Sequence, residues 1–249
     1  MTLSLRELAL PILPLLALAL LLSSCAARSG AGRDFIPTAV TETGQQDPAP
    51  EEILNRYFEY KHQTKPLTDY SVDVNIEAKL PSMHREGGMT ATRVLKGGKD
   101  VSYRGAQFTG DNSIKGDVIT RYLNGDRDSV RNPVNASITP ENYRFEHRGV
   151  AMYLDRKVHV FEVIPREKRV GLYRGELWID METAQPLREF GRFVRSPSVF
   201  LKDVDFVRDY HLIGTRTLPV RFITKMGTRL VGAAEVVVHF SNYKIETAE

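Results

Sequence analysis

Several strand-like segments in the C-terminal half of the chain are apolar on both faces, and this feature restricts the fold more than any other. Val158 and Val160 alternate with Phe161 and Val163, and the same double pattern recurs in residues 233–240. A strand with one face in water needs only one apolar face. The sheet is therefore expected to be either a closed barrel or sandwich with an ordinary core, or a curved sheet with an apolar cavity on its concave side.

The other strand signals predict a largely antiparallel sheet. Residues 70–79 alternate between apolar and polar side chains, and residues 92–96 and 99–103 flank Gly97-Gly98, a pair typical of a hairpin turn. Strands do not alternate with helices along the chain, which favours antiparallel pairing. Eight further strand-like segments are residues 142–147, 150–154, 157–164, 171–180, 186–194, 204–210, 218–226 and 233–240.

Two helices are expected to cover part of this sheet. Asp47 is expected to cap the first helix, with Pro48 in its first turn. The second is expected to begin at Asp111 or Asn112 and to stop at Gly125. The apolar stripes are Ile53, Leu54, Tyr57 and Phe58 in the first helix, and Ile114, Val118, Ile119, Tyr122 and Leu123 in the second.

The N-terminal 24 residues have the organisation of an export signal. A short polar start containing Arg6 precedes an apolar run over residues 8–22, and small residues follow the run. The alternative, a membrane-spanning helix, needs about 20 uninterrupted apolar residues, whereas Pro11 and Pro14 interrupt this run. Residues 1–24 are therefore expected to be a signal peptide.

The four residues Leu22-Ser23-Ser24-Cys25 resemble the bacterial lipobox, whose cysteine becomes the mature N-terminus. The resemblance implies that Cys25, the only cysteine of the chain, carries a diacylglyceryl thioether and an acylated amino group, with chains such as palmitate. Several acyl chains hold a protein on a membrane far more firmly than one. Ala26, rather than Asp, implies the periplasmic face of the outer membrane. The alternative is an ordinary signal peptide with a chance cysteine.

The segment after the signal has a different composition. Residues 25–50 are rich in Ala, Gly, Thr, Gln and Pro and are expected to form a lipid-anchored flexible linker. A random coil of this length spans on the order of 25–30 Å, which lets the following domain stand off the bilayer. Residues 51–249 are expected to form one folded domain.

The segment Gly175-Glu176-Leu177-Trp178-Ile179-Asp180-Met181-Glu182-Thr183-Ala184-Gln185-Pro186-Leu187-Arg188-Glu189 resembles a hairpin of the lipoprotein-sorting carrier superfamily, which includes Lol-type carriers and receptors and RseB-type sensors. An apolar-aromatic strand leads into a turn of the form Asp-x-x-Thr-x-x-Pro, and a charged strand returns. The resemblance implies a mainly β (α+β) fold, namely a curved, incomplete antiparallel β-barrel. A few helices would cover its concave apolar face, which could hold acyl chains.

Catalytic, cofactor and metal motifs are absent from the sequence. There is no nucleophile elbow, phosphate-binding loop, dinucleotide fingerprint or His-Glu-x-x-His pattern, and Cys25 is committed to the anchor. Asp203 and Asp205 share one strand face, as in a carboxylate pair for glycoside hydrolysis, but a solvated strand face is the far commoner explanation. Histidines occur singly, with no metal-ligand spacing, at His62, His84, His147, His159, His211 and His239.

The charge of the chain also limits its partners. A net charge of +3 and the expected envelope location argue against nucleic acid. Basic residues concentrate between residues 144 and 202, where they form either a patch for anionic lipid headgroups or an ordinary solvated face. The notable members are Arg166, Lys168, Arg169, Arg188, Arg192 and Arg195.

Together these features predict a non-enzymatic, outer-membrane-anchored lipoprotein that binds acyl chains of lipids or lipoproteins in an apolar cavity. Its role would lie in lipoprotein sorting or lipid handling, with no cofactor and with the membrane reached through Cys25. The alternative is an interaction or sensor module that has no lipid ligand and binds another envelope protein. The candidate cavity residues, chosen by strand alternation, are Leu177, Ile179, Val204, Phe206, Phe222, Val236 and Val238.

Overall fold

The protein is described by a computed structural model that covers residues 47–131, 136–195, 201–228 and 233–246. Within these ranges, ten strands form one antiparallel sheet in the order β3-β2-β1-β10-β9-β8-β7-β6-β5-β4. The strands are β1 (Tyr70–Leu80), β2 (Arg85–Lys96), β3 (Asp100–Gly110), β4 (Tyr143–Tyr153), β5 (Arg156–Pro165), β6 (Tyr173–Asp180), β7 (Pro186–Phe193), β8 (Leu201–Ile213), β9 (Arg216–Thr228) and β10 (Ala233–Ile245).

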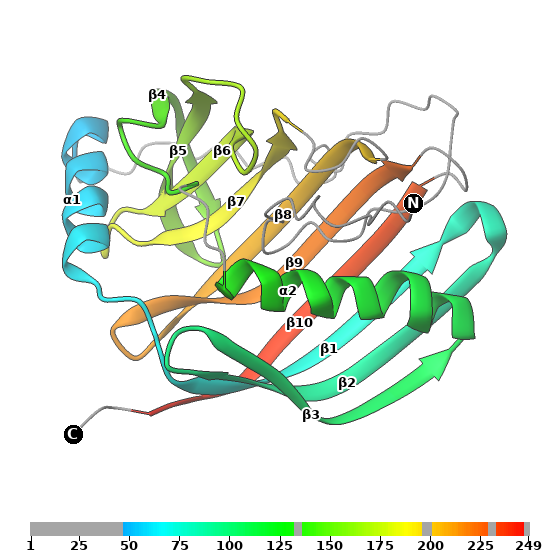
Figure 1. Cartoon of the computed structure of the whole chain (residues 1–249). Coiled ribbons are helices and arrows are strands. Elements are labelled where there is room, and N and C mark those ends of the chain that lie inside the picture. Colours follow the sequence, from blue (N-terminus) through cyan, green and yellow to red (C-terminus); the bar gives the residue numbers. More distant parts are fainter. Residues whose placement is uncertain (1–46, 132–135, 196–200, 229–232, 247–249) are drawn as a thin grey trace, which may run out of the picture.

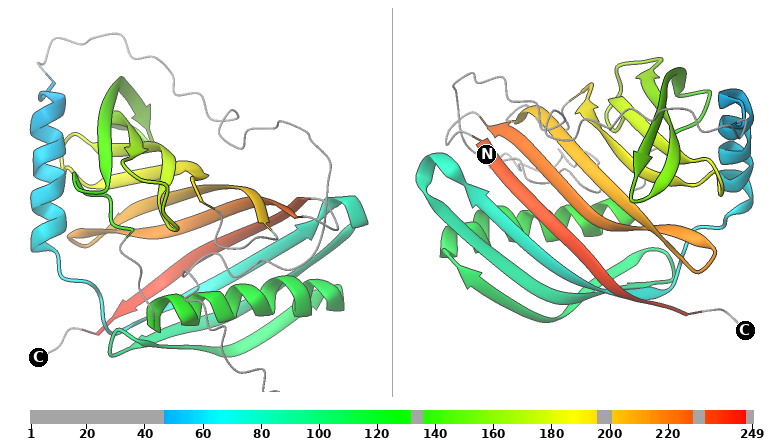
Figure 2. Two further views of the ribbon diagram at one scale, coloured as in Figure 1. Left: turned by 45° about the horizontal axis from the view of Figure 1, so that its top comes forward. Right: turned by 180° about the vertical axis from the view of Figure 1, so that it is seen from behind.

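The sheet curves strongly but does not close, since β3 and β4 stand at its two edges. Figure 1 shows the green helix (residues 120–131) lying over the sheet and the blue helix (residues 50–63) standing at one side of it, and Figure 2 shows the same arrangement from two further directions. Helix α1 (Pro50–Gln63) stands beside β6, whereas the π-helical segment η2 (Ile114–Ile119) and helix α2 (Thr120–Arg131) lie over β1, β2 and β3. The expected mainly β fold, a curved incomplete barrel with helices over its concave face, is confirmed.

Each predicted strand overlaps a strand of the structure, although β2 and β3 extend well beyond the predicted residues 92–96 and 99–103. Along β1, Val72, Val74 and Ile76 are buried, as the strict alternation predicts. The two strands predicted over residues 142–154 are a single strand, β4, with an irregularity between its residues 147 and 149. Gly149 has a φ of +126° there, a conformation open to glycine, so the chain bends without ending the strand.

Two of the predicted helix boundaries are wrong. Helix α1 begins at Pro50, after Ala49, whereas Asp47 makes an ion pair of 2.8 Å with Lys157. The fixed φ of Pro50 suits the first helical position, which explains this later start. Gly125 is buried inside α2, and the helix continues to Arg131 instead of stopping there.

Of the two predicted caps at the start of the second helical region, Asp111 makes the capping contact. Its carboxylate accepts a hydrogen bond of 2.7 Å from the backbone N–H of Ser113. The hydroxyl of Ser113 donates a second hydrogen bond of 2.6 Å to the same oxygen. These contacts satisfy a backbone donor that the start of a helix leaves without a partner.

The double apolar pattern of β5 serves two separate clusters. Phe161 and Val163 belong to the main core on the concave face, together with the apolar stripes of both helical regions. Val158 and Val160 point to the opposite face and pack with Trp178 in a smaller buried cluster that also contains Ala151 and Leu187. The second apolar face of this strand is therefore a satellite core on the convex side of the sheet.

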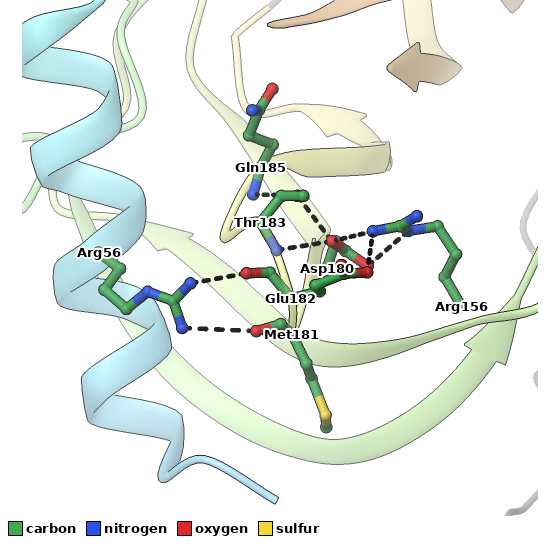
Figure 3. Close-up of polar contacts among 7 residues, drawn as sticks. All are labelled: Arg56, Arg156, Asp180, Met181, Glu182, Thr183 and Gln185. Atoms are coloured by element: carbon green, nitrogen blue, oxygen red, sulfur yellow. Dashed lines mark hydrogen bonds and ion pairs between the residues drawn. The ribbon is translucent and has the colours of Figure 1, made fainter. Parts of the chain in front are cut away.

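The turn between β6 and β7, which carries the Asp-x-x-Thr-x-x-Pro pattern, is organised by one buried carboxylate (Figure 3). Asp180 is 1% exposed and accepts hydrogen bonds from the backbone N–H of Thr183 at 2.8 Å and from its hydroxyl at 2.6 Å. Arg156 donates two further hydrogen bonds of 2.8 Å to the two carboxylate oxygens. The turn is thus fixed to β5 as well as to its own strands.

The same turn positions α1. Arg56 of the helix donates a hydrogen bond of 2.7 Å to the carbonyl of Glu182, and its other terminal nitrogen lies 3.5 Å from the carbonyl of Met181 (Figure 3). Ile53 and Tyr57 are buried on the side of the helix that faces the sheet. The hydrogen bonds of Arg56 and the buried apolar stripe together hold the helix against the sheet.

Candidate functional site

A pocket of about 790 Å³ opens on the concave side, between the C-terminal end of α1 and α2. Its walls come from both helices, the loop after α1, the central strands and the start of β9. This is the part of the concave face between the two helices. The lining residues are Tyr57, Tyr60, Lys61, His62, Thr64, Lys65, Pro66, Leu67, Tyr70, Val72, Arg93, Leu95, Tyr122, Asp126, Val130, Ser137, Pro186, Glu189, Tyr210, Arg216, Thr217, Leu218, Pro219, Phe240 and Tyr243.

Much of the pocket wall is apolar or aromatic. Val72, Leu95 and Leu218 are buried side chains of the sheet that reach this wall, and Tyr57 and Tyr122 contribute ring surface from the helical regions. Pockets that bind small molecules typically have volumes of about 300–1,000 Å³ and combine an apolar lining with a few polar groups. The size and lining of this pocket match that type of site.

A buried ion pair forms the wall nearest to α2. Arg93 of β2 donates hydrogen bonds of 2.7 and 3.1 Å to the two carboxylate oxygens of Asp126 in α2. Arg93 also donates to the hydroxyl of Tyr70 at 2.7 Å, and the hydroxyl of Tyr103 donates to Asp126 at 2.6 Å. Burial alone would lower the pKa of Arg93, but Asp126 outweighs it and raises the pKa. The arginine therefore stays charged. Together, Arg93, Tyr70 and Tyr103 connect α2 to β2, β1 and β3.

A second polar cluster lies in the wall formed by β7 and β8. Glu189 is buried and accepts hydrogen bonds from the hydroxyl of Tyr210 at 2.8 Å and from Arg208 at 3.3 Å. Burial first, and the Glu189 carboxylate second, raise the pKa of Tyr57 well above the ordinary value of tyrosine. This hydroxyl stays protonated, so the aromatic wall of the pocket carries no phenolate charge.

The seven residues predicted to line a cavity lie together, but they do so in the packed core. All are 0–3% exposed and belong to the main buried cluster of the concave face. None of them is among the residues that line the pocket. Their positions are Leu177 and Ile179 on β6, Val204 and Phe206 on β8, Phe222 on β9, and Val236 and Val238 on β10.

The predicted anchor and cleavage residues, Ser24 and Cys25, lie outside the described residues, as do the signal peptide and most of the predicted linker. Across the described ranges, no helix is both long enough and apolar enough to span a bilayer.

Two of the singly occurring histidines, His147 on β4 and His159 on β5, contact each other in the structure. His147 Nε2 lies 2.9 Å from His159 Nδ1, and His159 Nε2 lies 3.0 Å from the carbonyl oxygen of Pro48. Since a carbonyl only accepts, His159 Nε2 donates to Pro48, and the Nδ1 of a neutral His159 accepts from His147. Burial lowers the pKa of His159. Among the described residues, no three His, Cys, Asp or Glu side chains gather as metal ligands.

The acidic pair of β8 is part of an ion pair with the neighbouring strand. Arg192 contacts Asp205 at 2.6 Å and Asp203 at 3.2 Å, an arrangement that fits the solvated strand face.

The basic residues between positions 144 and 202 do not gather into one patch. Arg188 is 2% exposed and pairs with Asp209 on the convex face, where its guanidinium stacks over the rings of Tyr153 and Trp178. Arg166 donates a hydrogen bond to the backbone carbonyl of Pro140. The cations that line the pocket come instead from α1, the loop after it, β2 and β9.

Arg93 lines the pocket but was not among the predicted cavity residues, although its position in the strand alternation could have identified it. It faces Val72 across β1 and β2 in the sheet register, so its position in the alternation marks it as inward-pointing. A charged residue at an inward strand position needs a buried partner. That partner, Asp126, lies 33 positions away on another element, which local spacing cannot identify.

No protein-family model and no curated protein matches this sequence. Solved structures similar to the chain include a LolA superfamily protein from Nitrosomonas europaea, with 18% identity over 80% of this chain and 94% of that one and a TM-score of 0.42. An outer membrane lipoprotein-sorting protein domain from Vibrio parahaemolyticus matches with 16% identity over 80% and 94% and a TM-score of 0.43. A DUF1329 family protein from Desulfovibrio piger matches with 12% identity over 82% and 95% and a TM-score of 0.40.

Two of these structures are named after the superfamily, or the sorting role, that the hairpin at residues 175–189 resembles. At such identities the similarity concerns the fold alone, and function depends on the groups that line a site.

Proposed function

We propose that this chain is a non-enzymatic lipoprotein of the outer membrane that binds the acyl part of a lipid or lipoprotein in the pocket between α1 and α2. The pocket supports this proposal most directly. It offers about 790 Å³ beside buried aliphatic and aromatic side chains, in the size range of small-molecule sites. Acyl burial is favourable by about 25 cal/mol per Å² of apolar surface. A role in lipoprotein sorting or lipid handling follows from the same binding.

The lipid anchor on Cys25 and the outer-membrane location are parts of the same proposal. They are supported by the lipobox-like sequence Leu22-Ser23-Ser24-Cys25 and by Ala26 after it. An anchored carrier domain on a linker of about 25 residues reaches ligands near the membrane surface.

The mature chain, with Ser in place of Cys25 so that no covalent acyl group is present, tests ligand binding. We expect lipid mass spectrometry of the purified protein to detect co-purifying acyl lipid, and we expect the protein to take up a hydrophobic fluorescent dye. Absence of both lipid and dye would exclude the acyl-binding proposal and favour the interaction module.

A pocket-filling variant adds a site-specific test. Val130 lies on α2 in the pocket wall, so Val130→Trp is expected to weaken dye binding by about tenfold or more, which corresponds to 1.4 kcal/mol. Asn124→Trp adds the same side chain at an exposed position of the same helix and is expected to leave dye binding unchanged. Equal losses in both variants would argue against this pocket as the binding site.

A further inference from the structure

The charges that line the pocket do not balance. Its two carboxylates are occupied, since Asp126 binds Arg93 and Tyr103, and Glu189 binds Tyr210 and Arg208. The basic lining residues outnumber the acidic ones by four to two, as Lys61, Lys65, Arg93 and Arg216 line it together with Asp126 and Glu189. The pocket therefore has an excess of positive charge that its own wall does not neutralise.

This excess lies at the mouth of the pocket. Lys61 is in the last turn of α1, and Lys65 follows just beyond the helix; both side chains are exposed. Arg216, the first residue of β9, donates a hydrogen bond of 3.2 Å to the backbone carbonyl of Lys65. That bond holds the guanidinium beside the lysine-bearing loop. Within the described ranges, no carboxylate lies within 4.0 Å of a charged nitrogen of these three residues.

Several basic residues elsewhere on the surface do have acidic partners. Arg192 pairs with Asp205, Arg148 pairs with Glu146, and Lys225 pairs with Glu235. Like charges held close together without a counter-ion repel each other, and a bound anion relieves this repulsion. Arginine and lysine side chains are the usual protein ligands of phosphate oxygens.

We propose that the ligand is an anionic phospholipid, with its acyl chains in the pocket and its phosphate headgroup at Lys61, Lys65 and Arg216. This inference rests on the proposed acyl binding and adds the class of headgroup. A headgroup whose phosphate is balanced by an ammonium, such as phosphocholine, gains less from these three cations. The structure thus selects lipids with a net negative headgroup.

Short-chain lipids test this inference without interference from adsorption to membranes. The mature chain with Cys25→Ser is titrated with dihexanoyl phosphatidylglycerol and dihexanoyl phosphatidylcholine, both below their critical micelle concentrations. We expect the phosphatidylglycerol to bind at least about tenfold more tightly than the phosphatidylcholine, because each basic residue near the phosphate contributes about fivefold in affinity. The preference is expected to shrink as salt is added.

The double variant Lys61→Gln/Lys65→Gln is expected to weaken phosphatidylglycerol binding by about 25-fold and to weaken phosphatidylcholine binding by a clearly smaller factor. Lys99→Gln/Lys168→Gln removes the same charge at two exposed positions that do not line the pocket and is expected to change neither affinity.

Four outcomes would overturn the inference. Equal affinity for the two lipids, or equal losses in both double variants, would leave acyl binding intact and remove the headgroup assignment. Glycerol 1-phosphate binding as tightly as the lipid would make the mouth a site for soluble phosphate. Failure of both lipids to bind would overturn the proposed function as well.

Discussion

At the scale of single residues, Asp180 does the most to fix the local structure around the site. Its carboxylate organises the β6–β7 turn and binds Arg156, and the adjacent turn carbonyls hold Arg56 of α1. Since α1 forms one side of the pocket, this turn contributes to the site without lining it. The Asp-x-x-Thr-x-x-Pro pattern that begins at Asp180 therefore stabilises the turn and does not bind a ligand in the pocket.

The role of Asp180 leads to a stability prediction. Asp180→Ala is expected to lower the free energy of unfolding by about 2–3 kcal/mol, because partly buried donors of Thr183 and Arg156 lose their charged acceptor. Urea denaturation measures this loss. Glu182→Gln is the control, since Glu182 also pairs with Arg156 but its side chain is 82% exposed, and it should cost less than about 1 kcal/mol. Similar losses in the two variants would contradict the assigned role.

At the scale of secondary-structure elements, α2 is attached to the sheet by the buried Arg93–Asp126 pair. Asp126→Ala leaves the arginine buried without its partner and is expected to cost about 3–5 kcal/mol in unfolding free energy. The double variant Arg93→Met/Asp126→Leu removes both charges and is expected to recover much of that loss. Differential scanning calorimetry of the two variants measures the difference.

An exposed ion pair on the same helical region is the control for this prediction. Asp117 and Arg121 lie 3.7 Å apart on the surface, and Asp117→Ala should cost less than about 0.5 kcal/mol. If Arg93→Met/Asp126→Leu were no more stable than Asp126→Ala, the loss of unfolding free energy would come from altered packing around α2 and not from the unpaired charge of Arg93.

The start of α1 is expected to be sensitive to acid. The pKa of His159 in the folded protein lies below its ordinary value of 6.5, because burial disfavours the charged ring. The unfolded chain therefore binds more protons near that pH. The contribution of His159 to the free energy of unfolding is fully present above about pH 6.5, and it is lost as the pH falls toward the pKa of His159 in the folded protein. Unfolding measured between pH 7.5 and 5.5 tests this direction.

A histidine variant separates this effect from other titrations. His159→Gln keeps a donor for the carbonyl of Pro48 and removes the titrating ring, so the slope of stability against pH should become smaller. His239→Gln, at an exposed position of β10, should keep the wild-type slope. The opposite ranking of the two slopes would assign the acid sensitivity to another group.

At the scale of the whole molecule, an open sheet and two separated helices create a pocket that a closed barrel would fill with side chains. Helix α1 stands beside β6, and α2 lies over the strands at the β3 edge (Figures 1 and 2). The proposed anchor would keep this pocket near a membrane. Both parts are needed for the proposed function, since the pocket supplies the binding and the anchor supplies the location.

The anchor has its own test in cells. Cys25→Ser is expected to abolish membrane association of the mature protein, because the acylated sulfur is lost. Ser24→Ala keeps a small residue before the cysteine and should leave the protein in the membrane fraction. Membrane retention of the cleaved Cys25→Ser protein would refute the lipid anchor.

The sequence by itself determined the faces of the strands, the antiparallel hairpins and the two helical regions. These features follow from local sterics and from short periods, such as the alternation along residues 70–79 and the turn at Gly97-Gly98. The predicted cap at Asp47 was wrong because Pro50 offered a competing start, and the predicted stop at Gly125 was wrong because a glycine also fits within a buried helix.

Only the tertiary structure decided where the pocket lies and which charges it contains. The pairing of β1 with β10 brings Tyr70 beside Ile245, and curvature brings Lys65 of one loop to Arg216 of a distant strand. Contacts between residues so far apart depend on the summed burial of the whole sheet and leave no local period in the sequence. For the same reason, seven inward-facing residues could be predicted from alternation, whereas the boundary between packed core and open pocket could not.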